Sequence, residues 1–134
     1  MVGQEELAKL ADIIEELGYL LVSKHQTQAG IVQKEDKLKT QQIHDRDYCW
    51  GKESDVGIFE ISNPSLGVGG EIVDMIHQGK PVLCLFKKEL DKSVSVYIRG
   101  KQGSRFISTP FEYYAYETFE DAKQKILLFV EENL

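Results

Sequence analysis

Glu71 closes a glycine-rich segment that starts at Ser62 and reads Ser-Asn-Pro-Ser-Leu-Gly-Val-Gly-Gly-Glu. If a helix begins within this segment, its dipole stabilises the ionised form of a carboxylate in its first turns. An ionised carboxylate can act as a nucleophile in covalent catalysis. Glu71 is therefore a candidate nucleophile, and the alternative interpretation is an ordinary glutamate at a helix start.

A second carboxylate, Asp47, shares one face of a predicted helix with Ile43 and Trp50. Burying a carboxylate on an inward face is costly unless the group has a partner or a task. A structural aspartate with satisfied hydrogen bonds is the alternative. Two carboxylates in different environments are the minimum for cleaving a glycosidic bond, because one attacks the anomeric carbon and the other handles protons.

The glycine-rich segment runs from the carboxyl end of a predicted strand into a helix start, and open α/β sheets bind ligands at that edge. Gly67, Gly69 and Gly70 allow close approach of a ligand, and helix N-terminal N–H groups attract anions. A tight connection without a ligand explains the same glycines. The segment is neither a Walker loop nor a dinucleotide-binding G-x-G-x-x-G fingerprint.

Alternating strands and helices must position these residues. Residues 56–61 and 82–86 are nearly continuous apolar runs, typical of parallel strands buried on both faces. A helical pattern through residues 72–76, ended by Gly79, completes a right-handed βαβ unit. Amphipathic patterns predict a first helix that ends near Gly18 and a last helix capped by Thr118.

Shorter elements fill the remaining chain. The pattern predicts a strand at 19–22, an exposed loop at 26–40, a helix at 41–50, a short helix at 93–98, a loop at 100–104 and extended pieces within 106–116. We therefore expect residues 1–134 to form one α/β domain. Its architecture should be doubly wound, Rossmann-like or flavodoxin-like, with a mostly parallel sheet and helices on both faces.

Composition excludes several classes of function. A formal charge of -6 and a pI near 5.1 argue against binding polymeric nucleic acid. No apolar run approaches the roughly 20 residues of a membrane span, and the N-terminal residues lack signal-peptide features, so we expect a soluble, intracellular protein. The three histidines share no ligand spacing with the two cysteines, and neither a metal nor another cofactor is expected.

Several stretches point to one family. They read Ile-His-Asp-Arg-Asp at 43–47, Ser-Asp-Val at 54–56 and Glu-Ile-Ser-Asn-Pro-Ser-Leu-Gly-Val-Gly-Gly-Glu at 60–71. Further stretches read Lys-Pro-Val-Leu-Cys-Leu-Phe at 80–86, Ile-Arg-Gly at 98–100 and Gly-Ser-Arg-Phe at 103–106. Together they resemble the 2′-deoxynucleoside 5′-monophosphate N-hydrolases of the nucleoside 2-deoxyribosyltransferase superfamily, over nearly the whole chain.

This resemblance implies a role for each candidate. The glutamate matching Glu71 attacks C1′ of the deoxyribose, the base leaves, and water then releases 2-deoxyribose 5-phosphate. The aspartate matching Asp47 positions the sugar and protonates the departing base. The resemblance also implies a deoxynucleoside monophosphate as substrate and a location in the cytoplasm, with the nucleus as a second location.

Substrate-binding residues are implied in the same way. Ser65 and the backbone at Gly67 match the residues that meet the 5′-phosphate, and Gly69 belongs to the same segment. Ser104 matches a serine that reaches over from the other subunit of a homodimer. His25 resembles a histidine near the base, for which a solvated loop histidine is the alternative.

The chain departs from the family pattern at its start. Members usually begin with a strand and a Gly-Ser-Ile-Arg-Gly loop, whereas this sequence opens with Met-Val-Gly, so we expect the sheet to lack its usual first strand. Gly70 stands where relatives often carry an aromatic residue. Three alternatives stay open: a nucleoside 2-deoxyribosyltransferase, a cytidine monophosphate hydrolase of the superfamily, and a nucleotide-binding relative made inactive by its shortened N-terminus.

Overall fold

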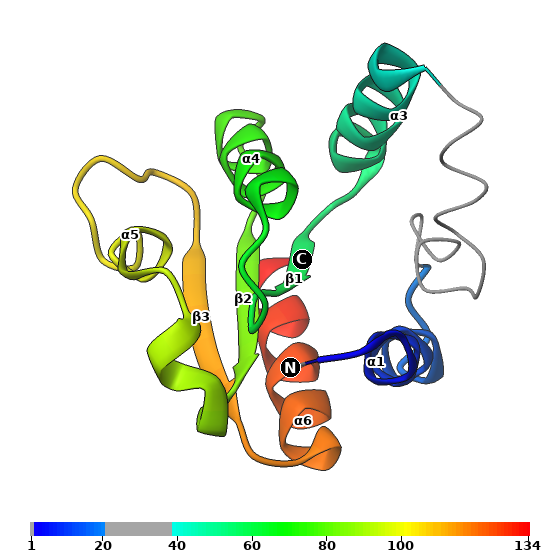
Figure 1. Cartoon of the computed structure of the whole chain (residues 1–134), viewed down its shortest axis with the longest axis vertical. Helices are drawn as coiled ribbons and strands as arrows, with labels where there is room; N and C mark the ends of the chain where they lie inside the picture. Colours follow the sequence, from blue (N-terminus) through cyan, green and yellow to red (C-terminus); the bar gives the residue numbers. More distant parts are fainter. Residues whose placement is uncertain (1, 21–38) are drawn as a thin grey trace.

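The computed structural model describes residues 2–20 and 39–134 (Figure 1). Helices and strands alternate along most of this part of the chain. In order they are α1 (Gln4–Glu16), α3 (Thr40–Glu53), β1 (Gly57–Glu60), α4 (Leu66–His77), β2 (Val82–Lys87), the 3-10 helix η2 (Lys88–Ser93), α5 (Val96–Arg99), β3 (Phe111–Tyr116) and α6 (Phe119–Asn133).

The three strands form a parallel sheet in the order β1-β2-β3. Ile58 lies opposite Leu83, and Cys84 lies opposite Tyr113. Within the described residues β1 pairs with β2 alone and forms one edge of the sheet. The predicted α/β class with a parallel sheet is confirmed.

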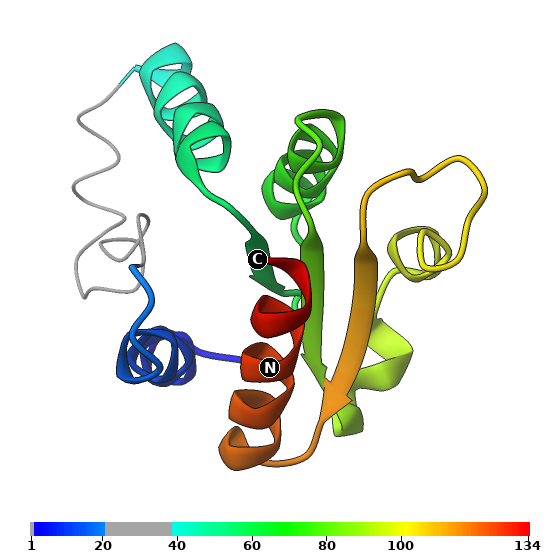
Figure 2. The same ribbon diagram turned by 180° about the vertical axis from the view of Figure 1, so that it is seen from behind.

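The central strand β2 has a helix layer on each face, because successive side chains of a strand point to opposite sides. Leu83 and Leu85 belong to a core cluster with α1 and α6. Cys84 and Phe86 belong to a second cluster that includes Ile72 of α4. Figures 1 and 2 show α6 on one face of the sheet and α4 with α5 on the other. The predicted helices on both faces are thus present.

The predicted helix ends are also confirmed. Gly18, with φ 92°, and Gly79, with φ 78°, adopt the left-handed conformation that glycine tolerates best, just after α1 and α4. The Thr118 hydroxyl accepts a hydrogen bond from the Asp121 N–H at 3.0 Å and caps α6.

Other boundaries differ from the prediction. Tyr19 and Leu20 are not in a strand, and the rest of the expected strand lies outside the described residues. The expected helix at 93–98 is replaced by the end of η2 at Ser93 and by α5, a four-residue helix that begins at Val96. β3 begins at Phe111 because Pro110 lacks an N–H for the ladder, although its carbonyl accepts from Val82 N–H at 2.9 Å.

Within residues 2–20 and 39–134, no helix has both the length and the apolar character needed to cross a membrane.

Candidate active site

The glycine-rich segment is folded mainly as the first turns of α4. Ser65 is the N-cap of this helix, and its side-chain oxygen accepts a hydrogen bond from Val68 N–H at 3.2 Å. Because α4 begins at Leu66, the three glycines are helical residues, and Glu71 lies in the second turn. Ile72 and Met75 on the same helix are buried and fasten it to the sheet.

Asp47 comes from α3, which packs against α4. No residue of α3 is fully buried, yet the Asp47 side chain is only 16% exposed. Arg46 forms an ion pair with the Asp47 carboxylate at 2.9 Å and lies 4.6 Å from the centre of the Trp50 ring. The expectation of a carboxylate on an inward face with Trp50 is therefore met only in part, since Asp47 is sheltered but not fully buried, and Arg46 is a partner for its charge.

Glu71 and Asp47 line the same cavity of about 370 Å³, which is large enough for a small organic ligand. Asp74, Trp50 and Met75 contribute to the same walls. The outer edge of β1 and the ends of α1 and α6 close the cavity on its other sides. The remaining lining residues are Ile14, Gly18, Tyr19, Leu20, Tyr48, Gly51, Glu53, Ser54, Asp55, Val56, Gly57, Ile58, Phe59, Gln78, Val130 and Leu134.

The cavity raises the pKa of Glu71 from 4.5 to about 7. Burial is the largest cause, the charges of Asp47 and Asp74 add to it, and Arg46 opposes it. The expectation that the helix dipole keeps Glu71 ionised is thus wrong, because desolvation and two like charges outweigh the dipole. A carboxyl group with this pKa takes up and loses a proton near neutrality, which suits nucleophilic and acid-base roles.

Among the described residues, the other predicted site residues do not line this cavity. Ser65, Gly67 and Gly69 lie at the start of α4, and a Cβ atom placed on Gly69 would meet nothing within 4 Å. Ser104 follows α5, and its hydroxyl accepts a hydrogen bond from Phe106 N–H at 3.2 Å. The loop after α5 lies on the side of α4 away from α3 (Figures 1 and 2). His25 is outside the described residues.

Two charged residues of the site were missed by the sequence reasoning. Asp74 follows Glu71 by three positions, a spacing that places both side chains on one helix face and could have revealed it. Arg46 adjoins Asp47 in the chain, but no periodicity distinguishes it from other surface arginines. In the described ranges, no group of three or more histidine, cysteine, aspartate or glutamate side chains is arranged to hold a metal ion.

No protein-family model matches the chain. The sequence is 35% identical over 118 residues to a protein of Thermofilum pendens named as a 2′-deoxynucleoside 5′-phosphate N-hydrolase, a match that covers 88% of this chain and 78% of that protein. It is 46% identical over 65 residues to the mouse 5-hydroxymethyl-dUMP N-hydrolase. The mouse match covers 48% of this chain and only 38% of the mouse protein.

Among solved structures, a CMP N-glycosidase of Clostridium botulinum superposes with a TM-score of 0.67. The superposition covers 94% of this chain and 92% of the other, at 22% identity. At that identity the similarity shows a shared fold and nothing more. The match to the T. pendens protein exceeds 30% identity and spans more than two thirds of that relative, and the chain therefore belongs to the 2′-deoxynucleoside 5′-phosphate N-hydrolase family.

Proposed function

We propose that this protein is an N-glycosidase that hydrolyses 2′-deoxynucleoside 5′-monophosphates to a free base and 2-deoxyribose 5-phosphate. The observation that carries the proposal is that Glu71 and Asp47 line one cavity and that the pKa of Glu71 is raised there to about 7. The names of the T. pendens and mouse relatives, both N-hydrolases of deoxynucleotides, support the same reaction class.

In the proposed mechanism, the ionised Glu71 carboxylate attacks C1′ of the deoxyribose. The bond from C1′ to the base nitrogen breaks as the bond from C1′ to the carboxylate oxygen forms. Asp47 orients the sugar and, in its protonated form, gives its proton to the departing base. Water then attacks C1′ and passes a proton to the Asp47 carboxylate, which releases 2-deoxyribose 5-phosphate, frees the Glu71 carboxylate and restores protonated Asp47.

The start of α4 supports a phosphorylated substrate. The N–H groups of its first turn and the helix dipole favour an anion. Ser65 uses its oxygen as a cap acceptor, so its hydroxyl proton can still donate to a phosphate oxygen. Each helical glycine costs about 1 kcal/mol relative to alanine. No neighbouring atom requires glycine at position 69 or 70, so both leave open space beside the helix that a ligand can use.

A homodimer would bring Ser104 to the substrate of the neighbouring subunit. Val96, Tyr97 and Phe106 are 82%, 76% and 80% exposed, and they lie close in sequence to Ser104. Because large apolar side chains left exposed favour association, we propose that this region contacts a second copy of the chain. Ser104 would then contact substrate in the other subunit.

The decisive experiment compares substrates. With dGMP, the protein should release guanine and 2-deoxyribose 5-phosphate, and Glu71→Ala should abolish release while dGMP still binds. With deoxyguanosine and free adenine, no deoxyadenosine should form. Deoxyadenosine formation would establish a transferase, and faster cleavage of CMP than of dCMP would establish a cytidine monophosphate hydrolase. Binding of dGMP without any base release at high protein concentration would establish a binding protein instead.

A further inference from the structure

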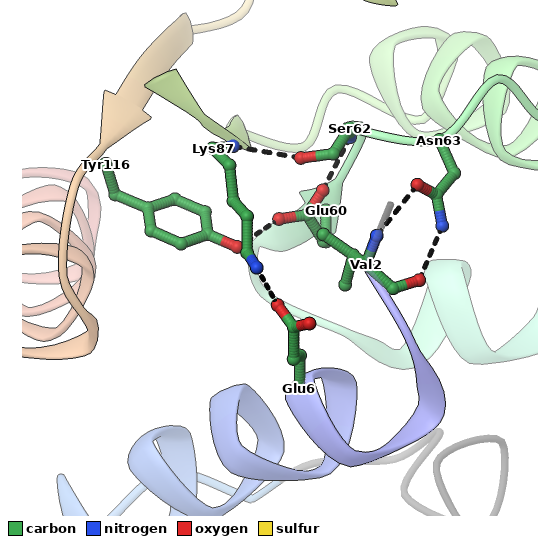
Figure 3. A network of polar contacts seen from close by, with 7 residues as sticks. All are labelled: Val2, Glu6, Glu60, Ser62, Asn63, Lys87 and Tyr116. Atoms are coloured by element: carbon green, nitrogen blue, oxygen red, sulfur yellow. Dashed lines mark hydrogen bonds and ion pairs between the residues drawn. The ribbon is translucent and has the colours of Figure 1, made fainter. Parts of the chain in front are cut away.

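A polar network joins the carboxyl ends of all three strands (Figure 3). Glu60 is the last residue of β1, Lys87 of β2 and Tyr116 of β3. One carboxylate oxygen of Glu60 accepts a hydrogen bond from the Tyr116 hydroxyl, and the other accepts from the backbone N–H of Ser62. Both oxygens of Glu60 are therefore engaged by donors.

Ser62 extends the network to β2. It is 1% exposed, and its side-chain oxygen accepts a hydrogen bond from Lys87 N–H at 2.9 Å. Its carbonyl oxygen accepts from the Ser93 hydroxyl, also at 2.9 Å. The chain that leaves β1 is thus fixed to the end of β2 and to η2.

Asn63 ties the same turn to the start of α1. Its side-chain oxygen accepts from Val2 N–H at 3.0 Å, and its amide nitrogen donates to the Val2 carbonyl at 2.7 Å. Glu6 of α1 forms an ion pair with Lys87 (Figure 3). The turn of residues 62–65 is consequently held from β2, β3 and α1 before it reaches Ser65.

A carboxylate suits position 60 better than an amide does. Burial and the hydrogen bond to Glu60 raise the pKa of the Tyr116 phenol far above its ordinary value, so the phenol stays a donor. Tyr116 is 3% exposed, and a buried hydroxyl left without a partner costs about 1–3 kcal/mol. A glutamine has one acceptor oxygen, so it would turn an NH₂ group toward one of the two donors.

We propose that Glu60 is a positioning residue for the substrate phosphate: it fixes the 62–65 turn and thereby the Ser65 hydroxyl and the first N–H groups of α4. This inference rests on the proposed function. Glu71 depends less on the turn, because Ile72 and Met75 anchor its part of α4 in the core. Loosening the turn should therefore weaken phosphate binding more than it slows chemistry.

The test compares two tyrosines of β3, each of which donates a hydrogen bond to a carboxylate. Tyr116→Phe removes the hydroxyl that Glu60 accepts from, whereas Tyr114→Phe removes an equivalent bond to Asp121 at the start of α6. Glu60→Gln and Tyr116→Phe should each raise KM for dGMP roughly tenfold and change kcat less than about threefold. Neither should alter KM for deoxyguanosine, which has no phosphate. Tyr114→Phe should change none of these constants.

Amide hydrogen exchange supplies a readout of the turn itself. The Ser62 amide should exchange faster in Glu60→Gln and in Tyr116→Phe, while the β2 amides keep their protection. Equal rises in KM for nucleotide and nucleoside, or an unchanged KM for dGMP in both folded variants, would overturn the positioning role alone. If the unmodified protein neither binds dGMP nor releases base, the proposed function fails and the positioning role falls with it.

Discussion

Two glutamates stand on either side of the 62–65 turn, in opposite surroundings. Glu60 accepts hydrogen bonds with both carboxylate oxygens, from Ser62 and from Tyr116. Glu71 accepts none from residues 2–20 or 39–134, and its cavity holds it beside two further carboxylates, Asp47 and Asp74. Within the described residues, donors satisfy Glu60, whereas Glu71 accepts no hydrogen bond there.

The difference separates a structural carboxylate from a reactive one. A backbone N–H and the hydroxyl of a buried tyrosine each donate to one oxygen of Glu60, so this side chain holds the geometry of the turn. Desolvation and like charges leave Glu71 with a pKa of about 7, at which a small change of surroundings moves its proton. The same residue type thus serves two purposes a short distance apart in the chain.

The largest expected difference between Glu71→Gln and Glu60→Gln is in kcat. Glu71→Gln removes the nucleophile with little change of shape, so kcat for dGMP should fall by at least ~10³-fold. Glu60→Gln should leave kcat nearly unchanged, because Glu60 does not contact the reacting atoms. Base release under saturating dGMP measures both. A comparable collapse of kcat in folded Glu60→Gln would erase the distinction.

At alkaline pH, the melting temperature Tm should rise in Glu71→Gln and fall in Glu60→Gln. The folded-state pKa of Glu71 is above its ordinary 4.5, so its contribution to stability is complete below about pH 4.5 and is lost as the pH rises through about 7. At about pH 9, Glu71→Gln should therefore raise Tm. Glu60→Gln should lower Tm by about 4 °C or more, because a buried donor loses its acceptor.

Thermal unfolding at about pH 9 and again near pH 4 checks these signs. The gain from Glu71→Gln should vanish at the lower pH, where Glu71 is protonated in both the folded and unfolded states. A loss of Tm in Glu71→Gln at the higher pH would mean that the ionised carboxylate is well paired.

The smallest expected effect concerns the neighbours of Glu71. Attack on C1′ needs the ionised carboxylate, so kcat should rise with pH through about 7. Asp74→Asn removes one of the two charges that raise the pKa of Glu71, while Asp47 and Arg46 still act on it. The midpoint of the kcat profile should therefore move to lower pH. Asp12→Asn, an exposed change on α1, is the matched control and should leave the midpoint in place.

The sequence predicted most of the regular structure because its signals are local. Continuous apolar runs marked β1 and β2, and Gly18 and Gly79 marked two helix ends through a backbone conformation that few other residues adopt. The start of β3 was missed because residues 106–110 read as extended from composition alone. Pairing with β2 begins only after Pro110.

The site was predictable in part. Glu71 and Asp47 were found through a motif and a helix face, and the structure places them at one cavity. The pKa of Glu71 was predicted in the wrong direction, because desolvation depends on how α3 packs against α4 and not on local sequence. Glu60 gave no signal of its own, since its partner Tyr116 lies on a different strand, far along the chain.

The central claim is that Glu71 attacks the sugar, and trapping the intermediate tests it most directly. The protein is mixed with dGMP, quenched in acid during turnover, digested and analysed by mass spectrometry. The account predicts a 2-deoxyribose 5-phosphate adduct on the peptide that contains Glu71, absent from the matching peptide of Glu71→Gln. An adduct on another residue, or the same adduct in Glu71→Gln, would contradict it.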